Sequence, residues 1–262
     1  MGVRRWFFAI AAAIALLSAP AQAQSRGEAA YDALLARYVV ASADGVNRVR
    51  YASWRANSAD VAALNAYVAA LESAQPSRMP RDARFAYWVN LYNAVTLQIV
   101  LENYPVASIR DIRSRTLDPR GLRGPWRTQR VTVEGQRLTL DQIENAILRR
   151  QFHEPRVHYA INCASIGCPN LMARAWRAET LDADLDQAAR AYVNHPRGVS
   201  VDAQGRIRAS RIYQWFADDF GSDGAQVLAH VRRYASPALR AGLSDAADIA
   251  SYDYDWRLNG AE

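Results

Sequence analysis

The sequence predicts an α+β fold in a single domain, and three observations support this prediction. First, residues 81–103 are apolar on nearly every side of a helix, which indicates a buried central helix. Second, residues 130–140 and 199–209 alternate polar and apolar side chains around a glycine-containing turn, as antiparallel hairpins do. Third, neither an internal repeat nor a low-complexity linker divides the chain of 262 residues.

The first 23 residues are predicted to be a secretory signal peptide and not part of the fold. A pair of arginines precedes an apolar run, residues 6–17, that is too short to span a bilayer, and a small-x-small sequence ends at Ala23. We therefore expect cleavage near Ala23, a domain over residues 24–262, and a periplasmic or secreted location. No later stretch reaches 18 apolar residues, so no transmembrane segment is expected in the mature chain.

Local patterns predict the elements that flank the central helix on its N-terminal side. Residues 31–40 carry apolar side chains at helical spacing, and residues 46–51 alternate like a short strand. Ser58 is a favourable N-cap for a helix over residues 59–73, whose apolar residues form one stripe. Tyr104-Pro105 ends the central helix because the residue before a proline avoids helical conformation.

Further elements are expected after an irregular Arg-, Pro- and Gly-rich connection over residues 106–128. Thr139 and Gln142 form a capping box for a helix over residues 140–150. Residues 157–162 alternate and predict a strand that leads into a Gly-Pro turn. The remaining expected elements are helices over residues 181–194 (capped by Thr180), 210–216 and 222–234, and an aromatic tail, residues 252–259, that packs on the core.

The stretch from Val157 to Leu171 is the first place to look for chemistry, because it holds His158 and both cysteines, Cys163 and Cys168. A thiol attacks as the thiolate, and a nearby histidine lowers its pKa and relays the proton. A third polar group must orient the imidazole. The candidates are Glu144, Asn90 and Asn93.

Each of these residues also has an alternative interpretation. Asn90 and Asn93 share a face of the central helix and either line a site or tie loops to the helix. Cys163 and Cys168 are either free thiols or joined as a disulfide, since exported cysteine pairs usually oxidise. His158 with both cysteines offers three zinc ligands, but the CxxC and HExxH spacings are missing, so neither a metal nor another cofactor is expected.

Other titratable residues are expected at the surface. His153, His195 and His230 lie beside loops or on solvated helix ends, and the pair Asp218-Asp219 is predicted to be a solvated helix end. The net charge of +6 is mild, and no basic block with interleaved aromatic residues occurs. The sequence therefore predicts no nucleic-acid partner.

Five segments together resemble the signature blocks of the domain of unknown function 547 (DUF547) family, and they occur in the family's order. The segments are FAYWVNLYNA (85–94), IENAILR (143–149), HYAINCASIGCPNL (158–171), the pair Asp219-Phe220, and YDWRLN (254–259). The resemblance implies a papain/transglutaminase-like fold, in which a central buried helix packs on a mostly antiparallel sheet. In that group of thiol hydrolases the cysteine lies at a helix N-terminus, whereas here no cysteine begins the helix over residues 81–103.

Two functional hypotheses follow. In the first, the chain is an exported cysteine-dependent hydrolase or acyl transferase that acts on amide bonds of a small-molecule or peptide substrate. His158 is then the base, Cys163 or Cys168 the nucleophile and Glu144 the orienting group, while Asn90 or Asn93 holds the histidine or polarises a carbonyl. In the second, the chain is a non-catalytic periplasmic binding or scaffold protein, and Cys163–Cys168 is a structural disulfide.

Overall fold

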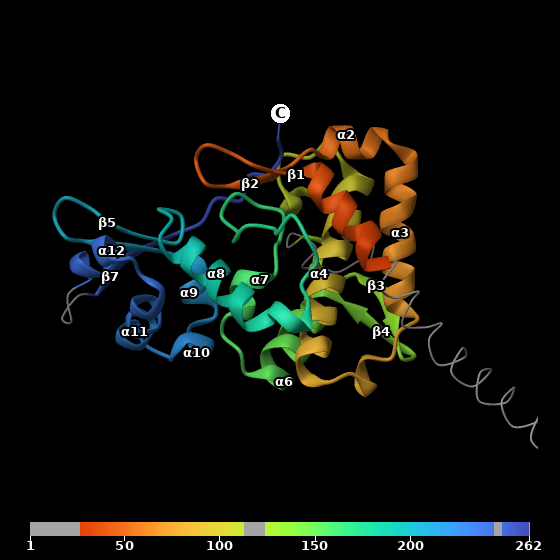
Figure 1. Ribbon diagram of the computed structural model, residues 1–262. Helices are drawn as coiled ribbons and strands as arrows, with labels where there is room; N and C mark the ends of the chain where they lie inside the picture. The colour runs from red at the N-terminus through yellow and green to blue at the C-terminus, as the bar shows by residue number, and fades with distance from the viewer. Residues whose placement is uncertain (1–26, 113–123, 244–247, 262) are drawn as a thin grey trace, which may run out of the picture.

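The structure, a computed structural model, describes residues 27–112, 124–243 and 248–261 (Figure 1). The helices and helical turns are, in order, residues 27–38, α2 (Tyr51–Ala56), α3 (Ser58–Glu72), η1 (Pro76–Arg78), α4 (Arg81–Asn103), η2 (Ile109–Asp111), η4 (Pro125–Arg127), α5 (Leu140–Gln142), η5 (Ile143–Arg149), α6 (Arg150–Phe152), α7 (Val157–Ala160), η6 (Ala178–Thr180), α8 (Leu181–Val193), α9 (Arg211–Trp215), α10 (Ala217–Phe220), α11 (Gly224–Tyr234) and α12 (Pro237–Gly242). The strands are β1 (Val39–Ala41), β2 (Asn47–Val49), β3 (Gln129–Val133), β4 (Gln136–Thr139), β5 (Val199–Val201), β6 (Ile207–Ser210) and β7 (Ile249–Asp253).

The predicted signal segment and the middle of the predicted connection over residues 106–128 lie outside the described residues. Across the ranges that are described, none of the helices has the length and apolar character needed to cross a membrane.

Helix α4 has the bounds that its sequence pattern predicts, and it is the centre of the larger hydrophobic core. Side chains on all of its faces are buried, including Phe85, Leu91 and Val100. Helices α2 and α3 pack against one part of it, and η5 packs against another. An apolar pattern without a polar face leaves a helix no stable place except between other elements, so α4 is buried.

The described strands form three small sheets. Strands β1 and β2 pair antiparallel, β3 and β4 form the predicted hairpin, and β5 and β6 form the second predicted hairpin, which β7 extends by parallel pairing. The helix–sheet mixture agrees with an α+β class. The single mostly antiparallel sheet that the family resemblance implies beneath the helix is not seen in the described chain, and the papain/transglutaminase-like fold stays a prediction.

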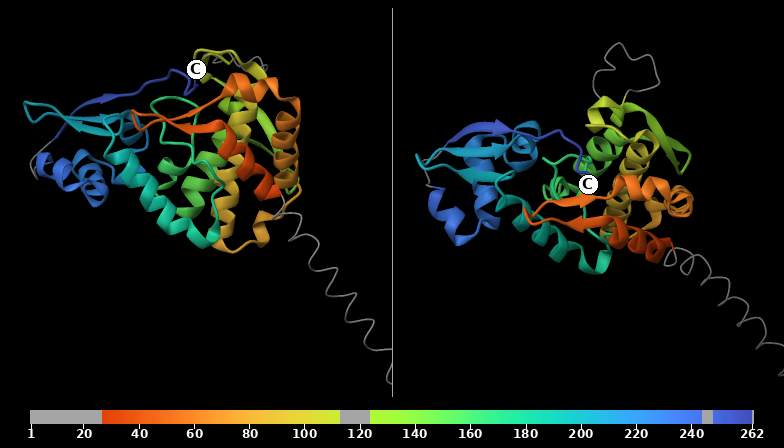
Figure 2. Two further views of the ribbon diagram at one scale, coloured as in Figure 1. Left: turned by 45° about the horizontal axis from the view of Figure 1, so that its top comes forward. Right: turned by 90° about the horizontal axis from the view of Figure 1, so that it is seen from above.

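A second, smaller core lies beside the first and is built from aromatic residues of α7 to α11, such as Tyr159, Tyr213 and Phe220. Figure 2 shows these two parts side by side, with the C-terminal segment running from β7 back to β2. There Val49 bridges Gly260, and the buried Asn259 side chain accepts a hydrogen bond of 2.8 Å from a tyrosine hydroxyl of α2. The predicted packing of the tail on the core is confirmed.

The predicted strand over residues 157–162 is wrong. Residues 157–160 form the short helix α7, and the chain becomes extended only from Ile161. Pro155 and Arg156 start the turn, because their carbonyls accept from the amides of His158 and Tyr159 at 3.3 and 2.9 Å. All four residues of α7 are buried. In a short segment that is buried on every side, the spacing of apolar residues does not distinguish a helix from a strand.

Three other local expectations need correction. Tyr51, placed in a strand, begins helix α2. Helix α3 is capped by Asn57, whose side chain accepts from the amide of Asp60, and not by Ser58. The hydroxyl of Thr180 donates to the side chain of Asp184 and makes no cap.

The capping box of Thr139 and Gln142 is confirmed, and the helix that it starts contains an unpredicted π-helical turn, η5. Such turns widen a helix by one residue and often occur at functional sites. Here η5 carries Glu144, Asn145 and Arg149.

Candidate functional site

A cavity of about 670 Å³ lies between η5, α7, α9 and the C-terminal tail, which is the size range of small-molecule sites. Its lining combines aromatic, ionisable and sulfur-containing side chains. The lining residues are Tyr92, Arg110, Trp126, Arg127, Asp141, Glu144, Asn145, His158, Ile161, Cys163, Cys168, Pro169, Ile212, Trp215, Phe216, Tyr254 and Trp256. Four of the six predicted site residues, His158, both cysteines and Glu144, therefore face one cavity.

His158 is buried and held firmly by its surroundings. Its Nε2 lies 2.6 Å from Oδ2 of Asp219, and its ring stacks on Phe216 with centroids 4.2 Å apart. Burial lowers the pKa of His158, and the hydrogen bond to Asp219 offsets part of this effect. A carboxylate only accepts hydrogen bonds, so Nε2 carries the proton and Nδ1 is left as the basic nitrogen.

Asp219 orients His158, and its prediction as a solvated helix end is wrong. Burial by itself would raise the pKa of Asp219, but hydrogen bonds from His158 and Arg149 outweigh burial and hold that pKa at about 2. The Arg149 Nε atom lies 2.5 Å from the same carboxylate oxygen. Adjacency to Asp218 hid this role in the sequence, and the only signal for it was the presence of Asp219 in one of the family-like blocks.

Glu144 does not take the predicted position beside the imidazole. One of its oxygens instead accepts a hydrogen bond of 3.1 Å from the hydroxyl of Tyr92, which projects from α4. The carboxyl faces the cavity but is densely surrounded by protein, and this burial raises its pKa to about 7. Glu144 is therefore a carboxyl group that is partly protonated at neutral pH, as general acids in enzymes are.

Asn90 and Asn93 tie loops to α4 and do not line the cavity. Asn90 exchanges two hydrogen bonds of 2.9 Å with the backbone of Trp176. Asn93 donates to the carbonyl of Ala160 at 3.0 Å and accepts from the amide of Asn162 at 2.8 Å. Of the two interpretations, loop-tying is the one that the structure supports. Through Ala160 and Asn162, Asn93 joins the end of α7 to the cysteine loop.

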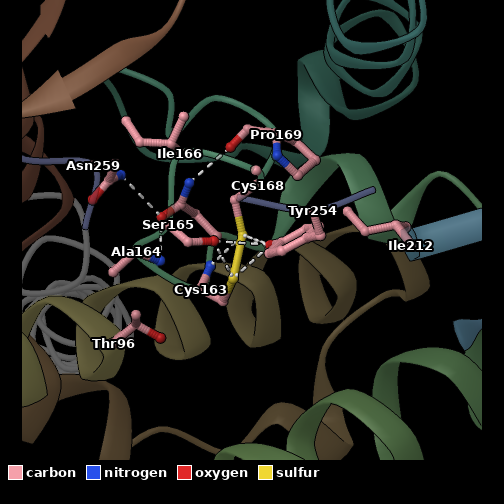
Figure 3. The surroundings of a disulfide bond; sticks show 12 residues. Thr96, Cys163, Ala164, Ser165, Ile166, Cys168, Pro169, Ile212, Tyr254 and Asn259 are labelled. Carbon is pink, nitrogen blue, oxygen red and sulfur yellow. Dashed lines mark hydrogen bonds between the residues drawn. A yellow bond between two sulfur atoms is a disulfide. The ribbon is translucent and has the colours of Figure 1, made fainter. Parts of the chain in front are cut away.

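The cysteine loop is also fixed from within by Asn162. Its side-chain oxygen accepts from the amide of Ala164 at 2.8 Å, and its side-chain nitrogen donates to the carbonyl of Pro169 at 2.7 Å. The loop between the two cysteines is therefore closed by hydrogen bonds at both of its ends (Figure 3).

Cys163 and Cys168 form a disulfide. Of the two interpretations of the cysteines, the structure therefore contains the oxidised pair and not two free thiols. The hydroxyl of Tyr254 lies 3.0 Å from the sulfur of Cys163 and 3.1 Å from that of Cys168. The amide of Cys163 also donates to the Cys168 sulfur at 2.9 Å. Figure 3 shows the disulfide with Ser165 and Tyr254 beside it. Because both sulfurs are joined to each other, they are not free to bind a metal as thiolates.

His230 was also predicted to lie at the surface, and this prediction is wrong. It lies on α11 and is buried in the second core, where its Nε2 is 3.0 Å from the hydroxyl of Tyr159. Burial lowers the pKa of His230 to about 4. This histidine is thus neutral at physiological pH and belongs to the packing of the second core.

We predict that Glu144 makes the protein less stable as the pH rises. Its pKa is about 7 in the folded state against 4.5 in the unfolded chain, so the folded state holds the proton more tightly. The resulting stabilisation is complete below pH 4.5 and is lost as the pH rises through about 7. At about 1.4 kcal/mol per unit of pKa, the complete loss is on the order of 3–4 kcal/mol, of which about 2–3 kcal/mol falls between pH 5 and pH 8.

The measurement is the free energy of unfolding in urea at pH 5 and pH 8 for the natural protein and Glu144→Gln. Asp219, His158 and His230 titrate in both proteins, so their effects cancel in the comparison. The natural protein should lose about 2–3 kcal/mol more than Glu144→Gln between the two pH values. An equal change in both proteins would contradict the prediction.

Comparison with known proteins adds one match. No curated protein and no solved structure matches the chain significantly. Residues 76–193 match the model of a family described as a protein of unknown function, DUF547. This range runs from η1 through α4, the π-helical turn and the cysteine loop to the end of α8, and so contains His158, Cys163, Cys168 and Glu144. The resemblance to the DUF547 family that the motifs predict is thus confirmed over residues 76–193.

Proposed function

We propose that the cavity is the active site of an exported cysteine-dependent hydrolase or acyl transferase that acts on amide bonds. One observation carries the proposal. His158, a partly protonated Glu144, Cys163 and Cys168 line the same cavity, and the half-buried carboxylate of Asp219 orients His158. A base, its orienting group and an acid are the groups that acyl transfer to a thiol requires.

Cys163 is the better candidate for the nucleophile. Its side chain is partly exposed, whereas Cys168 is only 4% exposed. The Tyr254 hydroxyl is within hydrogen-bonding distance of both sulfurs and favours a thiolate at either one, so exposure is what selects Cys163. In the disulfide, Cys163 has no thiolate to offer. A dithiol reductant must first reduce the bond, becoming a disulfide itself and leaving two thiols on the protein.

The reaction then has two steps. In the first, the Cys163 thiol loses its proton to solvent, the thiolate attacks the amide carbonyl carbon, the carbon–nitrogen bond breaks, and the amine leaves with a proton from Glu144. In the second, water attacks the thioester and gives a proton to Nδ1 of His158, the carbon–sulfur bond breaks, and the carboxylic acid leaves while Cys163 is regenerated as the thiolate. The proton on His158 then returns through solvent to Glu144. His158 acts on the water and needs no contact with the sulfur. A second amine in place of water makes the same site a transferase.

The disulfide itself favours a second candidate function. A closed Cys163–Cys168 bond in an oxidising compartment is typical of a structural staple. The protein would then be a non-catalytic periplasmic binding or scaffold protein, and the cavity would hold a ligand without altering it.

Burst kinetics with p-nitrophenyl acetate separate the two candidates. An enzyme that forms a thioester releases about one equivalent of nitrophenolate rapidly and then turns over slowly. The proposal expects this burst from protein treated with a dithiol and then freed of it, and none from the oxidised protein. If the reduced folded protein releases nitrophenolate no faster than the same protein in urea, the proposal fails and the binding function remains.

A further inference from the structure

One side of the cavity is a continuous surface of four aromatic residues, Trp126, Trp215, Tyr254 and Trp256, which we call the aromatic wall. Trp256 is central to it, with its ring centroid 4.6 Å from that of Tyr254, 5.5 Å from that of Trp215 and 5.9 Å from that of Trp126. Segments far apart in the sequence supply these residues: η4, α9 and the C-terminal tail.

The aromatic wall is incompletely covered by the protein. Trp215 is 43% exposed. Among the residues that the structure describes, it is the one large apolar side chain that is exposed to this degree. Exposing a tryptophan to water costs free energy, since the burial of a large apolar side chain is favourable. An exposed aromatic surface inside a cavity is typical of a binding site for a flat ring.

Two arginines, Arg110 and Arg127, line the same cavity. The guanidinium carbon of Arg110 lies 5.1 Å from the ring centre of Trp256, a cation–π contact that holds the side chain against the aromatic wall. Both side chains are exposed, and within the described residues neither has a carboxylate at ion-pair distance. Arg149, in contrast, is neutralised by Asp219. The first two arginines therefore keep their positive charge and their donors for a ligand.

The carboxyl groups that line the cavity do not neutralise the positive charge of Arg110 and Arg127. Asp141 and Glu144 face the same space, but Asp141 accepts from the side chain of Asn145 at 3.3 Å, and Glu144 accepts from Tyr92. Neither makes an ion pair with Arg110 or Arg127. An anionic group on a ligand would gain two charge-assisted contacts at these arginines.

We propose that the cavity binds an N-acylated aromatic amino acid, or a peptide that ends in one, by stacking its ring on Trp215 and Trp256 and binding its free carboxylate with Arg110 and Arg127. The inference names the substrate class of the proposed amide hydrolase and rests on that function only for the fate of the amide bond. Binding itself requires neither a free thiol nor a turnover.

Three small probes test the ring and the carboxylate separately: N-acetylphenylalanine, its amide and N-acetylglycine. Each is titrated into the full oxidised protein while tryptophan fluorescence is recorded, with NMR line broadening of the probe as a second measurement. Since hydrogen bonds to charged groups contribute about 1.5–3 kcal/mol, N-acetylphenylalanine should bind at least about tenfold more tightly than its amide. N-acetylglycine, which lacks the ring, should bind more weakly by a similar factor.

Variants assign the effects to residues. Arg110→Gln and Arg127→Gln should each reduce the advantage of the acid over its amide, and Trp215→Ala should reduce the advantage of N-acetylphenylalanine over N-acetylglycine. Arg137→Gln is the matched control, because Arg137 is an exposed arginine of β4 outside the cavity. It should change neither ratio.

Equal binding of the acid and its amide would overturn the carboxylate assignment, and equal binding of N-acetylphenylalanine and N-acetylglycine would overturn the stacking assignment. Absence of binding by all three probes would overturn the whole inference. Binding by the oxidised protein together with no nitrophenolate burst after reduction would support the ligand class and sink the hydrolase. A nitrophenolate burst after reduction together with no binding of the probes would support the hydrolase and rule out this ligand class.

Discussion

Cys168→Ser is expected to react with p-nitrophenyl acetate without any reductant, because the substitution leaves Cys163 with no sulfur to pair with. The natural protein should show no burst until its disulfide is reduced. The variant should release about one equivalent of nitrophenolate immediately. The serine hydroxyl keeps a polar group near Tyr254, so the cavity loses little else. This is the largest gain of activity that the account predicts.

Cys163→Ser is the matched variant, since it also breaks the disulfide and leaves a single free thiol. The remaining thiol, on Cys168, is the buried one. Cys163→Ser should show no burst with or without reductant, while its free energy of unfolding should fall as far as that of Cys168→Ser. Equal bursts from the two variants would remove the assignment of Cys163, and no burst from either would favour the structural disulfide.

Asn93→Ala is expected to cost about 2–6 kcal/mol of the free energy of unfolding. The substitution leaves the buried carbonyl of Ala160 and the buried amide of Asn162 without partners, and each unpaired buried group costs about 1–3 kcal/mol. Because these two groups connect α7 with the cysteine loop, the variant should also loosen the position of Cys163 relative to His158.

Asn90→Ala is the control for this effect. Asn90 makes the same two types of hydrogen bond on the same helix, but to Trp176, which does not line the cavity. Urea unfolding should show a similar loss of stability in both variants. The alkylation rate of reduced Cys163 with iodoacetamide should change only in Asn93→Ala. Equal alkylation rates in both would show that Asn93 has no special role at the site.

The parts of the fold that follow from local sequence were predictable. The bounds of α4, the two hairpins and the capping box at Thr139 all depend on contacts or patterns within a few residues. Helix α7 was not predictable in this way, because its four buried residues have no polar face to reveal a period.

The site was predicted in location but not in its connections. His158, Cys163 and Cys168 are close in sequence, so the cavity could be placed at their loop. The partner of His158 could not be chosen from the sequence, because Asp219 comes from α10, 61 residues away, and local pattern shows only a polar helix end. The aromatic wall could not be predicted for the same reason, since three segments that are distant in the sequence meet to form it.

The most direct test of the central claim is to locate the acyl group by mass spectrometry after reduced protein is mixed with p-nitrophenyl acetate. We expect one acetyl group, attached to Cys163 as a thioester, which is lost slowly in His158→Gln because the base for the attacking water is missing. Acetylation of Cys163 no greater than in the urea-unfolded chain, or loss of the acetyl group at the same rate in His158→Gln, would contradict the account.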